Sequence, residues 1–255
     1  MAKVAIVTVP YIRAYDHLLF AQQTIESLLR NTTRHALDLI AIANSLEEPT
    51  ESRSWATKTF HLLEENDENC LARAWNKGIR RGFERGADFC LVINLDVLFH
   101  PLYLDNLIAF AQATPQAIMW SGDLWKEEST LLTAPIESTT VESAEASGFL
   151  IDRRLFAAVG DFDEQFKPAY YEDVDMWYRI KRAGLRSCRT TTARFFHFES
   201  ITLQSALVHN ETVTVQNLRS ALVENERRYK EKWGGPRGQE IYTTPWGRHD
   251  VTAKS

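Results

Sequence analysis

One acidic residue in this chain stands close to the C-terminal end of an apolar run. Asn94, Leu95 and Asp96 follow the run Phe89–Ile93. A run this short and apolar predicts a strand buried on both faces. Open α/β sheets bind ligands at the C-terminal edge of such strands, where a carboxylate can hold a divalent cation and its phosphates. Asp96 could equally cap the following turn, and the triplet alone does not decide between the two.

A second acidic cluster opens a helical pattern that ends at Ala183. It consists of Glu172, Asp173 and Asp175. Acids are favoured in a first helical turn, so ordinary N-capping is one interpretation. Neighbouring residues lie about 100° apart on a helix, however, so Glu172 and Asp173 cannot face the same way. One of them can point into a cleft and act as a general base toward a hydroxyl.

His197 lies within the strand-like run 194–198, among aromatic residues. A histidine in such a run is more often a packed core residue than a ligand. Its interest comes from the acids elsewhere in the chain. Asp96, the acidic cluster and His197 could together supply a metal site and a base.

Apolar periodicity indicates the elements that would position these groups. Strands are predicted at 4–9, 37–43, 59–63, 89–93, 117–121, 148–151 and 189–198. Helices are predicted at 18–29, 71–79, 104–111, 153–159, 172–183 and 213–232. Alternating strands and helices in the first half predict crossover units and a mostly parallel sheet.

Composition excludes several classes of protein. The chain has 255 residues, 44% hydrophobic and 25% charged, which predicts one large α/β domain. A net charge of −5 argues against nucleic-acid binding. Three cysteines without paired spacing indicate a reducing compartment and no structural zinc. No apolar run is long enough to cross a bilayer, and Pro10 interrupts the N-terminal run, so a cytoplasmic protein is predicted. The absence of G-x-G-x-x-G after residues 4–9 argues against an NAD-dependent dehydrogenase.

Several segments, in order, resemble the family-2-type glycosyltransferases with the GT-A fold, especially bacterial rhamnosyltransferase-like members. The resemblance runs from Lys3 to about Trp246. Its segments are 70–78, the D-x-D-type position 94–96, 147–151 with 159–166, the Glu-Asp motif 171–175, the late histidine segment 196–200 and 232–235.

The resemblance implies a single GT-A type α/β domain over residues 1–246, with a Rossmann-like, mostly parallel sheet flanked by helices. Residues 1–100 would form the nucleotide-sugar-binding half, 101–202 the acceptor and catalytic half, and 203–246 a C-terminal helical extension. Residues 247–255 would be a tail.

The resemblance also implies roles for individual residues. Asp173 would be the catalytic base with Glu172 beside it, and Asp96 and His197 would hold Mn²⁺ or Mg²⁺. The nucleotide sugar would contact Thr8, Pro10, Tyr11, Asn44, Arg73, Asn76, Asn94, Leu95 and Asp96. The acceptor would contact Gly148, Tyr171, Asp175 and Trp177. For Thr8 and Asn44, ordinary strand-end turn chemistry is an equal alternative.

The implied reaction is inverting transfer of a sugar from a dTDP-, UDP- or GDP-linked donor, rhamnose among the sugars, to a hydroxyl of a glycan or glycoconjugate. An acceptor on a lipid carrier would add peripheral contact with the inner face of the membrane. The chain departs from the family pattern at Ala43, Glu68, Cys70 and Asn94. Ala43, Glu68 and Asn94 keep open an alternative, a weak or inactive GT-A-like domain that binds sugar nucleotide or a partner protein.

Overall fold

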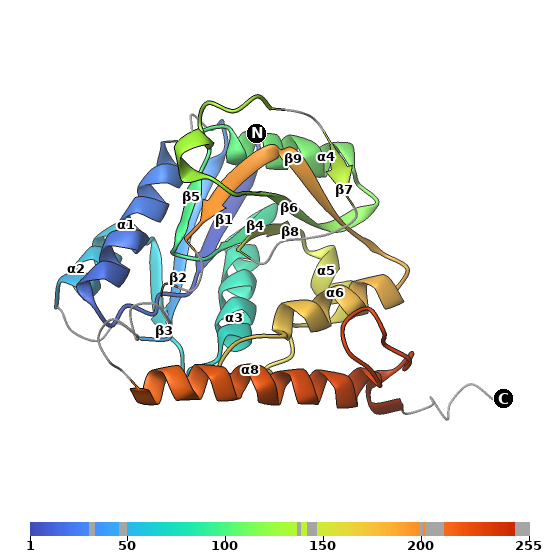
Figure 1. Cartoon of the computed structure of the whole chain (residues 1–255). Coiled ribbons are helices and arrows are strands. Elements are labelled where there is room, and N and C mark those ends of the chain that lie inside the picture. The colour runs from blue at the N-terminus through green and yellow to red at the C-terminus, as the bar shows by residue number, and fades with distance from the viewer. Residues whose placement is uncertain are drawn as a thin grey trace.

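The computed structural model describes residues 1–30, 34–45, 50–136, 139–141, 147–198, 201 and 212–247. Its centre is a nine-stranded sheet in which eight strands follow the order β3-β2-β1-β4-β8-β6-β9-β5, while β7 pairs with β9 (Figure 1). The first half supplies β1 (Lys3–Thr8), β2 (Ala36–Ala43), β3 (Leu62–Glu65), β4 (Phe89–Ile93) and β5 (Val97–Phe99). The second half supplies β6 (Ala117–Trp125), β7 (Thr140–Val141), β8 (Gly148–Ile151) and β9 (Arg186–His197).

Most strands run in one direction, as the crossover pattern predicts. The parallel pairs are β1 with β2, β1 with β4, β2 with β3, and β6 with β9. The strands β8, β5 and β7 are antiparallel to their neighbours, and all three belong to the half of the sheet beyond β4. The parallel strands therefore share one C-terminal edge, where a ligand site is expected.

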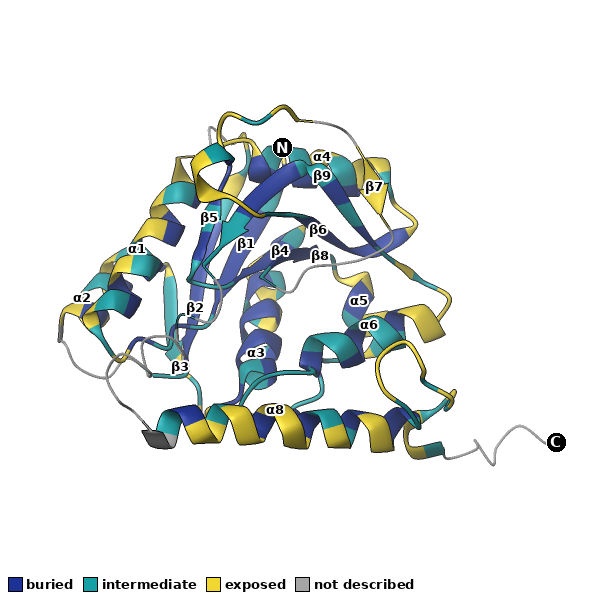
Figure 2. Ribbon diagram, viewed as in Figure 1, coloured by how far each residue is buried: buried dark blue, intermediate teal, exposed yellow. Residues whose placement is uncertain are grey.

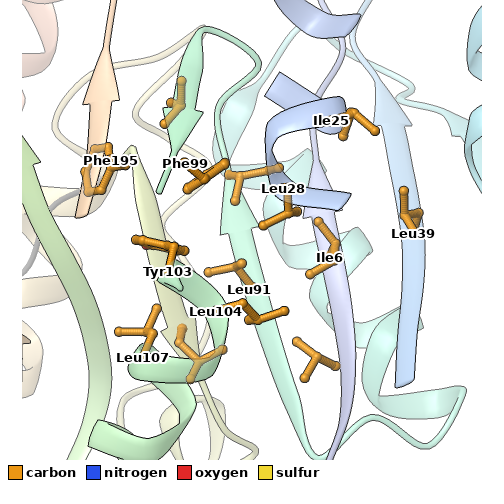
Figure 3. Close-up of a cluster of buried hydrophobic side chains, with 14 of the residues drawn as sticks. Ile6, Ile25, Leu28, Leu39, Leu91, Phe99, Tyr103, Leu104, Leu107 and Phe195 are labelled. Atoms are coloured by element: carbon orange, nitrogen blue, oxygen red, sulfur yellow. The ribbon is translucent and has the colours of Figure 1, made fainter. Parts of the chain in front are cut away.

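Helices cover both faces of the sheet. α1 (Tyr15–Leu29), α2 (Thr50–Thr59) and α4 (Tyr103–Ala113) pack on one face, around the buried cluster that contains Ile6, Leu28 and Leu104 (Figure 3). α3 (Leu71–Glu84), α5 (Arg154–Val159) and α6 (Glu172–Arg182) pack on the other. Burial on both faces explains why the central strands are continuous apolar runs.

α3 approaches the sheet closely because it presents glycine to it. A Cβ on Gly82 would lie 2.6 Å from the Cβ of Ala5 and 2.8 Å from the Sγ of Cys90. Contacts that short do not occur, so a larger residue would push α3 away from β1 and β4. This close packing fixes the helix that carries one wall of the candidate site.

α8 (Thr212–Trp233) crosses below α3 and α6 (Figure 1). Buried and exposed residues alternate along its length (Figure 2). Its buried residues Tyr229 and Trp233 pack with Phe166 in a separate cluster. α8 therefore braces the segment that leads into α6.

The predicted fold class is confirmed, with differences in single elements. α2 and β5 were not expected, and the predicted strand 59–63 is wrong in its bounds because α2 runs to Thr59 and β3 begins at Leu62. β9 begins at Arg186, earlier than predicted. Residues 202–211 of the predicted C-terminal extension and 248–255 of the predicted tail lie outside the described residues. The division into halves stays a prediction.

Candidate active site

Two segments far apart in sequence meet at the C-terminal edge of β4. Asp96 lies in the turn between β4 and β5, and His197 is the last residue of β9. β5 pairs antiparallel with β9, which places Val97 opposite His197. The His197 Nε2 and the Asp96 Oδ1 lie 3.0 Å apart, and the Phe198 N–H donates to the Asp96 carbonyl at 3.0 Å. The sheet itself therefore brings these two candidate ligands together.

α1 supports this arrangement from the open side of β5, the edge strand. The Val97 N–H donates to the Thr24 Oγ1 at 3.0 Å, and the Phe99 N–H donates to the Ser27 Oγ at 3.1 Å. These hydroxyls take the place of a neighbouring strand and satisfy backbone donors that would otherwise be unpaired. The turn that carries Asp96 is thus held on both sides.

A cavity of about 330 Å³ opens beside the Asp96–His197 pair. That size is at the lower end of the range for small-molecule sites. Six predicted residues line it: Tyr11, Asn44, Asn94, Leu95, Asp96 and His197. Its apolar wall includes Val9, Leu71 and Trp75, and its far side is formed by Pro168, Ala169 and Tyr170. An apolar cleft with a few convergent polar groups is the usual form of a ligand site.

The Asp96–His197 pair fits a divalent cation. Side-chain exposure is 19% for Asp96 and 17% for His197, so both are reachable from the cavity without being freely hydrated. Neighbouring ligands of an octahedral ion with bonds of about 2.1 Å lie about 3.0 Å apart, as these two atoms do. Within the described residues no group of three or more metal-ligating side chains occurs. The protein would therefore supply two ligands, and a bound diphosphate or water the others.

The acid pair lies at the start of α6, directly after Tyr170 and Tyr171. Both tyrosines have positive φ, +79° and +74°, which is costly for residues with a side chain. Glu172 is 3% exposed, and its Oε2 has no hydrogen-bond partner among the described residues. Burial, followed by the charge of Asp173, raises the pKa of Glu172 well above its ordinary value. Burial also raises the pKa of Asp173. The Val174 N–H, which donates to the Asp173 Oδ1 at 2.8 Å, partly offsets this by lowering that pKa.

Asn225 on α8 holds the strained segment that precedes the pair. Its side-chain amide is buried and donates to the carbonyls of Ala169 at 2.9 Å and Tyr170 at 3.1 Å. The Leu71 N–H at the start of α3 donates to the Pro168 carbonyl at 2.8 Å. Two helices therefore fix the backbone that forms one side of the cavity and leads into Glu172.

Four predicted nucleotide-sugar residues do not belong to the cavity wall, as far as the described residues define it. Thr8 is fully buried, and its hydroxyl donates to the Ile93 carbonyl. Pro10 is buried, and its carbonyl accepts from the Asn44 N–H. Asn76 bonds both backbone groups of Phe162, which locks α3 to the segment before α6. Arg73 pairs with Glu164 at 2.8 Å on the outer side of α3.

The predicted acceptor residues are also engaged within the protein. Asp175 is fully buried and accepts from Arg179, Lys232 and Trp233, so it anchors α6 to α8 instead. Gly148 is buried in β8, and Tyr171 packs against Tyr229. Trp177 lies beneath the Arg237 guanidinium, beside a separate cavity of about 450 Å³. None of these four, and neither Glu172 nor Asp173, is among the described residues that line the first cavity.

Sequence reasoning missed several residues of the site. Asn69 and Tyr170 line the cavity, and Asn225 holds its wall. Ser147 donates or accepts a hydrogen bond with the His197 Nδ1 at 3.1 Å. Tyr170 precedes the Glu-Asp motif directly and could have been inferred from it. Ser147 opens the segment 147–151, which the resemblance singled out without giving this residue a role. Asn69 and Asn225 contact the site only through the fold and carry no local signal.

Comparisons with known proteins support the fold. No family model matches the chain. A galactofuranosyl glycosyltransferase from Leishmania donovani is 22% identical over 237 residues, which cover 71% of this chain and 55% of that protein. A crystal structure of GalNAc-T7 with UDP, GalNAc and Mn²⁺ matches with a TM-score of 0.65 and 14% identity, over 91% of this chain and 48% of that one. S. aureus TarS 1–349 matches with a TM-score of 0.56 and 10% identity, over 77% of this chain and 60% of that one.

These likenesses show that the chain has the GT-A fold, as the sequence resemblance implied. The chain spans about half of the length of the first two proteins and three-fifths of the TarS 1–349 chain. Across the residues that the structure describes, no helix is both long and apolar enough to span a membrane.

Proposed function

We propose that this chain is a glycosyltransferase that moves a sugar from a nucleoside-diphosphate donor to an acceptor hydroxyl with inversion at the anomeric carbon. The observation that carries the proposal is the cavity itself. It lies at the C-terminal edge of the parallel strands, holds the Asp96–His197 pair and is closed by the segment that leads into Glu172–Asp173. The fold comparisons and the name of the Leishmania relative support the same class of reaction.

The donor would lie in this cavity, with its diphosphate near Asp96 and His197. When bound there, Mn²⁺ or Mg²⁺ would act as a Lewis acid that neutralises the charge of the departing diphosphate. The crystal structure of GalNAc-T7, which contains UDP and Mn²⁺, supports testing manganese first. Tyr11 and Asn44 line the same cavity, and Asn44 accepts from the Asn66 amide at 2.6 Å. That bond leaves the amide N–H groups of Asn44 as donors for a nucleotide.

Asp173 would take the proton of the acceptor hydroxyl. The acceptor oxygen forms its bond to the anomeric carbon while the bond from that carbon to the diphosphate oxygen breaks. The proton then remains on the Asp173 carboxylate. Glu172 is the more deeply buried acid, and burial followed by the charge of Asp173 raises its pKa, which favours its neutral form. This difference in burial favours Asp173 as the base and Glu172 as its neutral neighbour.

A thermal-shift screen of UDP, dTDP and GDP with Mn²⁺ or Mg²⁺ would identify the nucleotide, since a ligand bound by the native state raises the melting temperature. Rhamnose and galactofuranose donors are the first sugars to test, the second because of the Leishmania relative. A membrane-associated acceptor stays a prediction.

Slow release of nucleoside diphosphate from a donor sugar, lost in Asp96→Ala, is the expected result. A nucleotide that stabilises the protein without any release or transfer would instead support the alternative of a GT-A-like binding domain. If no nucleoside diphosphate stabilises the protein and no nucleotide-sugar donor turns over with either metal, the proposed function is refuted.

A further inference from the structure

Ser147 connects the ends of three strands at the candidate site. It immediately precedes β8, and its carbonyl accepts from the Asn94 N–H at 3.1 Å, next to the end of β4. Its hydroxyl lies 3.1 Å from the Nδ1 of His197, the last residue of β9. The imidazole is therefore bounded on both sides, by Ser147 at Nδ1 and by Asp96 at Nε2.

The contacts of the His197 ring with Ser147 and Asp96 decide what each ring nitrogen does when it carries the hydrogen and when it does not. A neutral imidazole carries one N–H, on either nitrogen, whereas a serine hydroxyl both donates and accepts. With the hydrogen on Nε2, the ring donates to Asp96 and the Ser147 hydroxyl donates to Nδ1. With the hydrogen on Nδ1, the ring donates to the Ser147 Oγ, and the Nε2 lone pair faces the Asp96 carboxylate.

The second arrangement is unfavourable without a cation. It would leave a nitrogen lone pair and a carboxylate oxygen 3.0 Å apart, two electron-rich atoms that repel each other. A divalent cation between them removes the repulsion and needs that lone pair as a ligand. Ser147 satisfies Nδ1 in both arrangements without any heavy atom having to move.

We propose that Ser147 is a positioning residue whose hydroxyl holds the His197 imidazole at Nδ1 in either tautomer and thereby raises the affinity of the Asp96–His197 pair for a divalent cation. The inference rests on the metal site of the proposed function. In a neutral ring, the contact with Asp96 favours the hydrogen on Nε2, and cation binding requires it on Nδ1, where the Ser147 Oγ accepts it. Residues that fix the other nitrogen of a ligating histidine commonly contribute ten- to a hundred-fold in metal affinity.

The test uses the full chain and Mn²⁺ alone, with bound ion measured by electron paramagnetic resonance at fixed pH. Ser147→Ala is expected to bind Mn²⁺ about ten- to a hundred-fold more weakly than the wild type. Ser147→Thr keeps the hydroxyl and is expected to bind nearly as the wild type does. His197→Ala gives the affinity that remains without the imidazole.

A second readout follows the ring directly. The ¹⁵N shifts of the His197 side chain, measured with and without diamagnetic Mg²⁺, report which nitrogen carries the hydrogen. In the wild type the hydrogen is expected to move from Nε2 to Nδ1 when Mg²⁺ is added, and in Ser147→Ala less of the Nδ1–H form is expected at the same Mg²⁺ concentration, because the hydroxyl that accepts from Nδ1 is missing. A merely structural role for Ser147 would leave these shifts unchanged.

Equal Mn²⁺ affinity in wild type and Ser147→Ala, or an unchanged tautomer, overturns the inference and leaves the proposed function standing. If Ser147→Ala does not fold, Ser147→Cys replaces it, since a thiol is a weaker donor and acceptor of similar shape. A wild-type chain that releases nucleoside diphosphate from a donor sugar but binds no Mn²⁺ or Mg²⁺ refutes the metal site and this inference while the transfer function survives.

Discussion

The Asp96 Oδ1 and the His197 Nε2 lie 3.0 Å apart although 101 residues separate them. The pairing of β5 with β9 makes this contact, and α1 holds the outer edge of β5 through Thr24. Because backbone pairing places the two residues side by side, their proximity does not depend on a flexible loop. This rigidity is what a cation site requires, since ligand geometry must be formed before binding.

Asp96→Asn is expected to lower donor turnover by about a hundred- to a thousand-fold, the usual loss when one electrostatic stabiliser of a transition state is removed. The amide keeps the shape but loses the charge that attracts a cation. Steady-state release of nucleoside diphosphate measures the effect. Glu26→Gln is a matched control, since Glu26 forms an exposed pair with Arg30 and does not line the cavity. Wild-type turnover in Asp96→Asn would contradict the assigned role.

Asp173→Asn is expected to reduce sugar transfer by about a hundred- to ten-thousand-fold, the range in which a general base contributes. Glu172→Gln tests which acid of the pair is the base, because Glu172, with its raised pKa, is already expected to be neutral. It should reduce transfer far less than Asp173→Asn does. If the two variants rank the other way round, Glu172 is the base.

The raised pKa of Asp173 also predicts the pH dependence of transfer. The base must be ionised, so kcat/KM should rise with pH through the raised pKa of Asp173 and level off above it. The acidic limb should therefore lie at higher pH than an exposed aspartate would give. A profile that is already flat where ordinary aspartates titrate would show that Asp173 is not the titrating group.

Glu172 further predicts that the protein loses stability as pH rises. Its pKa in the folded state lies above the ordinary 4.5, so above about pH 4.5 the native state binds more protons than the unfolded state. The free energy of unfolding then falls with rising pH until Glu172 ionises, by at most about 1.4 kcal/mol per pH unit for this one group. Urea unfolding of wild type and Glu172→Gln across this window measures it. The variant should show a shallower fall, whereas Glu26→Gln should follow the wild type.

The parts of the fold that follow local pattern were predictable, and those that depend on distant partners were not. The runs that form β1, β2 and β4 are apolar on both faces, so each can be recognised from the sequence as a buried strand. α2 was missed because its residues 50–59 are largely polar, and Ala56 and, in part, Trp55 are the apolar residues it packs into the core. β5 was missed because three residues show no period, and β9, the strand with which it pairs, lies about a hundred residues later.

The residues predicted for the candidate site divide in the same way, into those that the structure brings together and those whose polar groups are already bonded elsewhere. Asp96 and His197 were predicted from type and position, and the structure brings them together. Thr8 and Asn76 were placed at the nucleotide by resemblance, yet their polar groups bond backbone atoms inside the protein. A sequence shows that a side chain is polar, but only the packed structure shows which partner has already satisfied it.

Asn225→Ala is expected to affect both stability and transfer. It would remove the donor to the half-buried carbonyls of Ala169 and Tyr170, at a cost of about 0.5–1.5 kcal/mol for each hydrogen bond lost. The strained backbone before Glu172 would relax, and misplaced groups would lower transfer by about ten- to a hundred-fold. Urea unfolding and transfer kinetics check the two effects. The neighbouring control Glu226→Ala, which breaks an exposed pair with Lys230, should change neither.

Lys232→Met tests whether the network around Asp175 anchors α6. The Lys232 Nζ contacts Asp175 at 2.6 Å and Asp163 at 2.7 Å, and both Lys232 and Asp175 are buried. Removing one partner of a buried ionic network leaves charge without compensation, so a loss of about 3 kcal/mol in the free energy of unfolding is expected.

Lys230→Met is the matched control, two residues earlier on the same helix. Lys230 forms an ion pair of 2.7 Å with Glu226, but both side chains are more than two-fifths exposed. Exposed pairs contribute about 0–1 kcal/mol, so this variant should unfold almost as the wild type does. Equal losses in the two lysine variants would show that burial does not set the strength of these contacts.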